Sequence, residues 1–189
     1  MTDREAPTED PRPSGLRAAE SLVVVLTGDG KGKSSSAFGM VMRAVARGWR
    51  VAVVQFIKSG DWPAGEQKIC EQLGVQWLSL GAGFTWDSND LEHDKSLARS
   101  AWSTAAELID GGQYDLVVLD EITYLPTWKW IDVDSITSTI SQRPSHVNVV
   151  CTGRDAPQEL VDLSDTVTSM TNIKHAYDSG IAAKRGIDY

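Results

Sequence analysis

The sequence predicts an α/β fold in which a mostly parallel sheet is covered by helices on both faces. Short apolar runs rich in β-branched residues, such as Leu22–Leu26, alternate along the chain with amphipathic segments of helical length. A glycine-rich turn at Gly28–Gly32 links this run to a helical segment. A later apolar run, Leu116–Leu119, ends in the acidic pair Asp120 and Glu121. Together these observations indicate parallel strands that are joined by helices and that carry polar residues where they end.

Six segments are predicted to be strands. The run Leu22–Leu26 has no polar alternation, which favours a strand buried on both faces of a parallel sheet. The run Leu116–Leu119 has the same character. In chain order the predicted strands span residues 22–26, 50–56, 75–80, 115–119, 147–152 and 166–170.

Five amphipathic segments are predicted to be the connecting helices. In the first, Phe38, Val41, Met42 and Val45 recur at helical spacing, and Gly48 ends the helix. The other four lie at residues 65–73, 97–109, 133–141 and 158–163. One helix therefore separates each strand from the next, which is the arrangement of a parallel sheet.

The 189 residues suffice for one domain with a sizeable core, which we place at residues 21–189. Residues 1–20 are predicted to form a disordered or loosely docked arm. Its first part carries Pro7, Pro11 and Pro13 with mixed charges and almost no large apolar side chain. A lid over the active site is the other interpretation of this arm.

The composition excludes several classes of protein. A formal net charge of −8 argues against a general nucleic-acid binder, whose surface normally has a basic face. No apolar run approaches the roughly 18 residues of a membrane helix, and the first residues lack a secretory signal pattern. Cys70 and Cys151 form neither a disulfide framework nor a zinc motif. We therefore expect a cytoplasmic protein without a membrane or nucleic-acid partner.

The segment Thr27–Ser34 predicts a phosphate-binding loop of the P-loop (RecA-like) type. Its glycines allow a tight turn with inward-facing N–H groups, and the following helix adds its positive dipole end. Lys33 supplies a charge for phosphate oxygens, and Ser34 supplies a hydroxyl for Mg²⁺. The strict motif has glycine where this chain has Thr27. The predicted ATP-binding residues are Gly28, Asp29, Gly30, Lys31, Gly32, Lys33, Ser34, Ser35 and Arg43.

The acidic pair Asp120 and Glu121 follows a buried strand, as in the second motif of nucleotide-binding P-loop proteins. Ligands of parallel α/β folds bind at the carboxyl ends of the strands, so this pair should face the same crevice as the phosphate loop. Ser34, Asp120 and Glu121 are the predicted ligands of Mg²⁺, with Mn²⁺ as the alternative ion. The two motifs predict a nucleoside triphosphate but leave its reaction and its base open.

From residue 22 to residue 189 the chain resembles the corrinoid adenosyltransferases, which act on cob(I)alamin or cob(I)yrinic acid a,c-diamide. The resemblance rests on the two motifs and on the order and spacing of further runs. These runs are Val54–Lys58, Trp62–Glu66, Gly83–Trp86, Thr152–Arg154, Lys174–Asp178 and Gly186–Tyr189.

The resemblance implies a specific reaction. Co(I) of a corrinoid attacks C5′ of ATP, and inorganic triphosphate leaves. The protein then has to orient cobalt against C5′ and to stabilise the charge on the triphosphate, without a general base. Lys33 and Glu121 are the catalytic residues that the resemblance implies. It also implies that ATP lies in the opposite direction from that in P-loop kinases.

Phe84 and Trp86 are the corrinoid-binding residues that the resemblance implies. Aromatic residues at the matching positions of the family press on the lower face of the corrin and exclude its axial ligand. An apolar wall suits this task because it offers cobalt no lone pair. Without the resemblance, both side chains would be interpreted as core aromatics.

Several other polar residues are weaker candidates. Arg43 is predicted to contact the nucleotide, and a surface position without such a contact is an equal alternative. Lys58, Arg154 and Lys174 are candidates for contacts with phosphate or with the corrin side chains. We reject His175 as a cobalt ligand, because the implied mechanism needs an empty axial position.

Two other functions remain open at the level of sequence. A small-molecule kinase or NTPase would use the same loop to transfer a phosphoryl group, and its product would be ADP. A nucleotide-dependent binding module would bind without turnover. Neither has an obvious use for Phe84 and Trp86. The family further implies a homodimer and an electron donor such as a reduced flavin or flavoprotein, and the substrate can be an early biosynthetic corrinoid or salvaged cobalamin.

Overall fold

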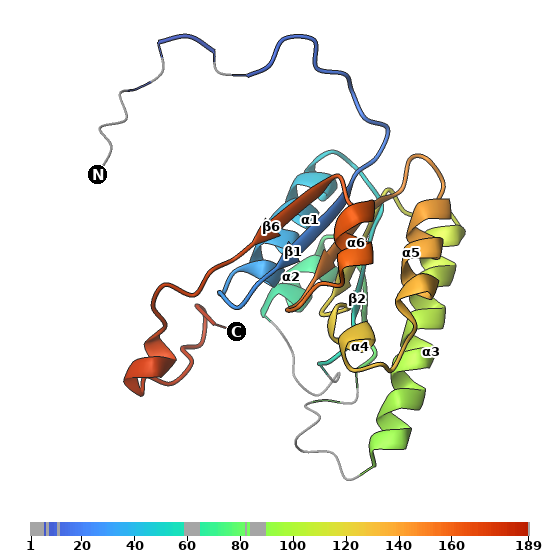
Figure 1. Ribbon diagram of the computed structural model, residues 1–189, viewed down its shortest axis with the longest axis vertical. Helices are drawn as coiled ribbons and strands as arrows, with labels where there is room; N and C mark the ends of the chain where they lie inside the picture. The colour runs from blue at the N-terminus through green and yellow to red at the C-terminus, as the bar shows by residue number, and fades with distance from the viewer. Residues whose placement is uncertain are drawn as a thin grey trace.

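The described part of the chain forms a six-stranded sheet in the order β3-β2-β4-β5-β1-β6, with helices on both faces (Figure 1). The computed structural model describes residues 6, 8–10, 12–58, 65–81, 83 and 90–188. Every strand pair in the sheet is parallel, so the predicted α/β fold is confirmed. The strands are β1 (Val23–Thr27), β2 (Val51–Gln55), β3 (Gln76–Ser79), β4 (Leu116–Asp120), β5 (Asn148–Thr152) and β6 (Thr166–Ser169).

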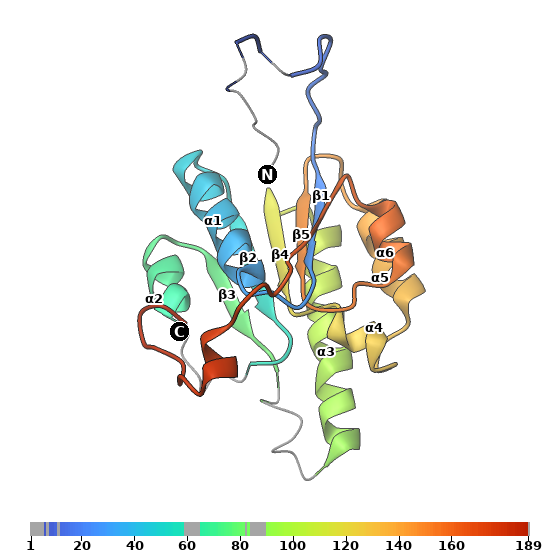
Figure 2. The ribbon, with the colours of Figure 1, turned by 60° about the vertical axis from the view of Figure 1, so that its left-hand side comes forward.

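The helices divide between the two faces of the sheet, as Figure 2 shows. The helices α1 (Lys33–Ala46) and α2 (Gly65–Gln72) cover one face. The other face is covered by α3 (Leu91–Asp110), α5 (Val133–Gln142) and α6 (Gln158–Leu163). Side chains alternate along each strand, so Val25 packs into the core beneath α3, α5 and α6, whereas Leu26 packs against α1. Both faces of the central strands β2, β4 and β5 are therefore buried, as their uninterrupted apolar runs predicted, whereas the edge strand β6 is exposed.

The first helix shows how the sequence fixes an element that positions the site. Gly32 stands at the N-cap with a φ of 111°, a conformation that favours glycine. Ala37, Phe38, Val41 and Ala44 are its buried residues, at the predicted helical spacing. The helix ends at Ala46, just before Gly48 with its φ of 76°. This geometry aims the first turn of α1 at the carboxyl edge of the sheet.

Three features of the helices differ from the sequence prediction. The long helix α3 begins at Leu91, six residues before the apolar face that predicted it, because the Asp90 carboxylate accepts a hydrogen bond from the backbone N–H of His93. The helix α4 (Tyr124–Thr127) and the 3-10 helix η2 (Ala176–Ser179) were not predicted. Each has four residues, which is too short for a visible apolar period.

The described residues among the first twenty are exposed and belong to no helix or strand. The arm that they form leads away from the sheet (Figure 1). In the described residues, no helix has both the length and the apolar character that a membrane crossing requires.

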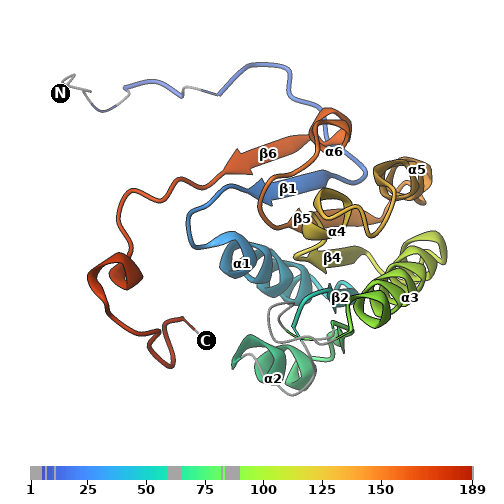
Figure 3. The same cartoon turned by 60° about the horizontal axis from the view of Figure 1, so that its bottom comes forward.

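The described residues that directly follow the carboxyl ends of the strands lie at one edge of the sheet, because the strands are parallel. Figure 3 shows β1 and β6 side by side with their arrowheads toward the same side. This edge receives Gly28–Gly32 after β1, Glu121 after β4 and Gly153–Asp155 after β5. It is the edge at which ligands of open parallel sheets bind.

Candidate active site

The loop Gly28–Gly32 is held rigidly against the chain that leaves β6. The N–H of Gly30 donates to the carbonyl of Met170 over 2.8 Å. A Cβ atom at Gly28 would overlap the backbone of Met170, and the φ of Gly28 is 92°. Glycine is the residue that satisfies both constraints, so Gly28 lets the loop pack directly against the backbone at Met170.

Lys33 is folded back over its own loop. Its Nζ donates to the carbonyls of Gly28 and Gly30, each over 2.7 Å. Partial burial lowers the pKa of this ammonium, Arg154 lowers it further, and Asp29 and Glu121 oppose the shift. The Lys33 ammonium is therefore held beside the positive end of the α1 dipole. These two positive charges repel each other, and a bound anion would offset that repulsion.

Glu121 is strained, largely buried and without a partner for one of its oxygens. Its φ is 68°, outside the usual range for a residue with a side chain, and its N–H donates to Thr152 Oγ1 over 2.9 Å. Burial is the main cause that raises its pKa to about 7, the Asp120 charge adds to it, and Lys58 and Lys33 oppose it. Among the described residues, the buried Oε2 atom has no hydrogen-bond partner. Such an atom is costly, which points to a ligand.

Asp120 lies behind Glu121 and has a different role. It is fully buried, and its oxygens accept hydrogen bonds from Thr152 Oγ1 (2.8 Å) and Gln55 Nε2 (3.0 Å). It does not line the cavity that Glu121 lines. The sequence predicted that one acid of this pair holds Mg²⁺ directly or through water, and for Asp120 this stays a prediction. What the structure shows is that Thr152 Oγ1 donates to Asp120 and accepts the N–H of Glu121, so that Asp120 helps to position its neighbour.

A cavity of about 260 Å³ brings most of the predicted nucleotide residues together. Ser34 and Glu121 both line it, and a hydroxyl together with a carboxylate oxygen that lacks a hydrogen-bond partner among the described residues is a donor set that fits Mg²⁺. The cavity is lined by Lys31, Gly32, Lys33, Ser34, Ser35, Phe38, Lys58, Glu66, Glu121 and Asp188.

Besides Asp120, four described site residues that the sequence predicted do not line this cavity: Gly28, Asp29, Gly30 and Arg43. Arg43 is in the last turn of α1, ten residues and about 15 Å along the axis from Lys33, and it lines a different hollow. A nucleotide contact for Arg43 thus finds no support within one copy of the chain. Asp29 is exposed, and its Oδ1 lies 3.8 Å from Arg154 Nε. Phe84 and Trp86 lie outside the described residues.

The weaker candidates separate clearly. Lys58 lines the cavity, and Arg154 reaches the phosphate loop through Asp29. Lys174 lines a neighbouring hollow on the other side of Lys31. His175 uses Nδ1 to accept the N–H of Tyr177 over 3.0 Å, so it caps η2.

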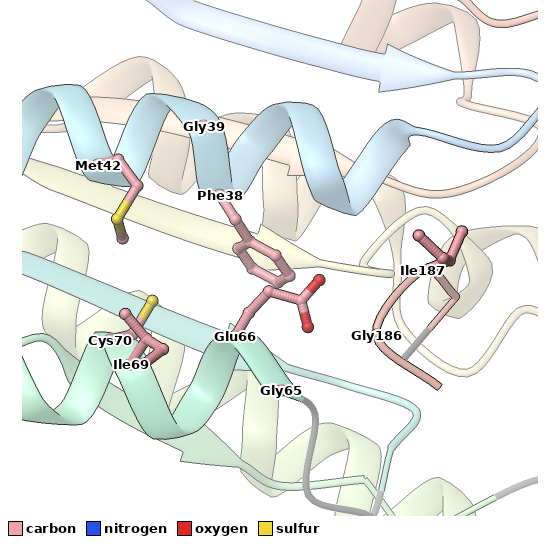
Figure 4. Close-up of a pocket in the computed structure, with 9 residues that line it drawn as sticks. All are labelled: Phe38, Gly39, Met42, Gly65, Glu66, Ile69, Cys70, Gly186 and Ile187. Atoms are coloured by element: carbon pink, nitrogen blue, oxygen red, sulfur yellow. The ribbon is translucent and has the colours of Figure 1, made fainter. Parts of the chain in front are cut away.

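Glu66 and Asp188 are the cavity residues to which the sequence analysis assigned no role. Glu66 also borders a groove of about 440 Å³ between α1 and α2. In Figure 4, Phe38 and Met42 of α1 face Glu66, Ile69 and Cys70 of α2 across this groove, and Gly186 and Ile187 close one end. Asp188 is 155 residues from Lys33 in the chain, and no local motif connects the two.

Residues 19–189 match the family described as ATP:corrinoid adenosyltransferase BtuR/CobO/CobP. The chain belongs to this family. The family resemblance noted from the sequence over residues 22–189 is thus confirmed.

Three curated relatives of this family bear the name corrinoid adenosyltransferase and match nearly the whole chain. The protein of Escherichia coli (strain K12) is 38% identical over 180 residues, which cover 95% of this chain and 91% of the relative. That of Pseudomonas aeruginosa is 38% identical over 189 residues, or 99% and 93% of the two chains. That of Sinorhizobium sp. is 41% identical over 174 residues, or 90% and 81%.

Proposed function

We propose that this chain transfers the 5′-deoxyadenosyl group of ATP to the Co(I) centre of a corrinoid and releases inorganic triphosphate. The observation that carries the proposal is the match to the corrinoid adenosyltransferases over residues 19–189. The cavity agrees with it, because the reaction needs a site for an anionic leaving group and no general base.

The loop and Lys33 bind the triphosphate and stabilise it as it leaves C5′. When ATP binds, Lys33 exchanges its two carbonyl acceptors for phosphate oxygens. The N–H groups at the start of α1 and the Lys33 ammonium are then in place before the bond to C5′ breaks, so little reorganisation is needed when negative charge develops. Lys58, which lines the same cavity, adds a second charge.

Ser34 and Glu121 would hold Mg²⁺, or Mn²⁺ in its place. The bound ion supplies charge neutralisation for the triphosphate oxygens. Glu121 binds as the carboxylate, so a cation that occupies the site favours loss of the proton that burial retains on this side chain. Asp120 and Thr152 keep Glu121 in its strained orientation.

In this proposal, Phe84 and Trp86 contact the lower face of the corrin. For these two residues the proposal rests on the sequence resemblance alone. An apolar wall that displaces the axial ligand makes Co(II) easier to reduce, and it orients the resulting Co(I) toward C5′. The electron donor is a reduced flavin or flavoprotein. The protein acts as a homodimer in the cytoplasm, on a biosynthetic corrinoid or on salvaged cobalamin.

The test is to mix the protein anaerobically with cob(I)alamin, ATP and Mg²⁺ while the visible spectrum and the phosphate product are followed. We expect loss of the Co(I) band with one triphosphate released for each cobalt alkylated. The double variant Phe84→Ala, Trp86→Ala should keep this activity with pre-reduced Co(I) and lose it when Co(II) must be reduced on the enzyme. An unchanged spectrum with release of ADP would contradict the proposal and favour a kinase or NTPase.

A further inference from the structure

The C-terminal segment, residues 171–188, returns to the phosphate site after leaving the sheet. Figure 3 shows it running from β6 through a helical turn and back toward α2. Asp188 lines the phosphate cavity, and Ile187 lines the groove between α1 and α2. Its last turn therefore closes one side of the site.

Asp188 fastens this turn to the phosphate loop. One carboxylate oxygen forms an ion pair with Lys31 Nζ, and the other accepts the N–H of Lys184 over 2.7 Å. The carbonyl of Lys184 in turn accepts the N–H groups of Ile187 (3.1 Å) and Asp188 (2.8 Å). The Asp188 side chain thus both stabilises the turn at residues 184–188 and ties it to Lys31 of the phosphate loop.

Asp188 makes the cavity less suited to a triphosphate than the phosphate loop alone would be. Three acids, Glu66, Glu121 and Asp188, line it beside three lysines, and Asp188 forms an ion pair with one of these, Lys31. The cavity volume of about 260 Å³ falls below the roughly 300–1,000 Å³ that small-molecule sites usually have. Removal of Asp188 would give the cavity a surplus of positive charge and more room.

The ion pair between Lys31 and Asp188 can be replaced easily by a contact with another anion. The Lys31 side chain is 54% exposed, and ion pairs this accessible are weak. Gly180 precedes the stretch that would move and Gly186 lies within it, with φ values of 73° and 82°, and a Cβ atom added at either would meet open space. Glycines at such positions can absorb a change of backbone angles at little steric cost.

We propose that residues 184–188 are a gate on the triphosphate site, in which Asp188 occupies on Lys31 the place of a phosphate oxygen. The triphosphate opens the gate by taking Lys31 from Asp188, and the turn then detaches from the loop. The inference rests on the proposed function in one respect, that this cavity binds the triphosphate of ATP.

The first test is binding of inorganic tripolyphosphate to the full chain, measured by titration calorimetry at low ionic strength. Asp188→Asn should tighten binding at least about threefold, and the gain should shrink as salt screens the charges. Asp178→Asn is the matched control, because it makes the same charge change in the same segment while Asp178 lines neither cavity. Binding by the Asp188 variant that equals or falls below that of the control would overturn the gate.

The second test follows the turn itself. Trypsin cleavage after Lys184 and Arg185 in the wild-type protein should become faster with tripolyphosphate, because a detached turn can adopt the extended form that proteases need. Slower cleavage would mean that the segment closes over the ligand, which contradicts the gate. If the wild-type protein binds no tripolyphosphate, the proposed function fails as well. If it binds normally and Asp188→Asn has no effect, only the gate fails.

Discussion

The two ends of α1 both carry basic residues, but the environments of those residues are opposite. At its beginning, Lys33 stands at the positive end of the helix dipole beside a loop of backbone N–H groups. At its end, Arg43 and Arg47 stand at the negative end and line a hollow of about 310 Å³ with Trp49. The cations at the far end already complement the dipole. Lys33, at the beginning of the helix, adds its charge to the positive end of the dipole. We propose that these two positive charges together bind the triphosphate.

The comparison is tested most strongly by removing one cation from each end. Lys33→Ala should lower kcat/KM for ATP by about 10²–10³-fold, the usual loss for one fixed donor at a developing negative charge. Arg47→Ala should change it by less than about twofold, because Arg47 lies beyond the reach of the cavity. Release of triphosphate from ATP and reduced cobalamin measures both. If the Arg47 variant lost as much kcat/KM as the Lys33 variant, both ends of α1 would contribute to the reaction, which contradicts the account.

Gly28 before α1 and Gly48 after it both have positive φ, so replacing each by alanine compares the two ends in the free energy of unfolding. Gly28→Ala and Gly48→Ala both force a side chain into the left-handed region, at roughly 1–2 kcal/mol each. The Gly28 variant should lose roughly 1–3 kcal/mol more, because its Cβ overlaps Met170 while that of Gly48 meets open space. Urea unfolding gives both values, and equal losses would mean that the loop is not held against the chain after β6.

A third prediction concerns the pH dependence of stability at the same edge of the sheet. Burial raises the pKa of Glu121 to about 7 from its ordinary value of 4.5, so between these values the folded protein keeps a proton that the unfolded chain has released. Stability should therefore fall as the pH rises through this window. Glu121→Gln should flatten that part of the profile, whereas Glu107→Gln, at an exposed position on α3, should leave it unchanged.

The measurement is thermal unfolding between pH 4.5 and 8 in EDTA and without nucleotide, so that no cation binds Glu121. A slope that persists in the Glu121 variant would assign the dependence to another group. The difference between the profiles of the wild-type protein and the Glu121 variant isolates the contribution of Glu121.

The fold was predictable from the sequence because its signals are local and repeated. The run Leu22–Leu26 predicted β1 to within one residue at each end, since a parallel strand buried on both faces has no polar position. The early start of α3 was missed, because the cap at Asp90 lies before the apolar period begins. The strand order could not be predicted, since it depends on contacts between segments far apart in the chain.

The site was predictable where a motif contains it or where a strand of the parallel sheet ends in polar residues, as at Glu121. Gly32, Lys33 and Ser34 share a turn, so their sequence spacing places them together in the cavity. Asp120 and Glu121 are neighbours whose roles differ, because the left-handed backbone at Glu121 turns one acid into the cavity and leaves the other in the core. Asp188 reaches Lys31 only through the return of the C-terminal segment, which no pattern in the sequence announces.

The central claim is that the loop holds a triphosphate while the bond between C5′ and its oxygen breaks. The most direct measurement uses ATP with ¹⁸O in the position that bridges C5′ and the α-phosphorus, in an anaerobic reaction with cob(I)alamin. We expect the label to appear in inorganic triphosphate, found by mass spectrometry, together with an alkylated cobalt. Label that stays in ADP or AMP would show cleavage between phosphorus and oxygen and would contradict the account.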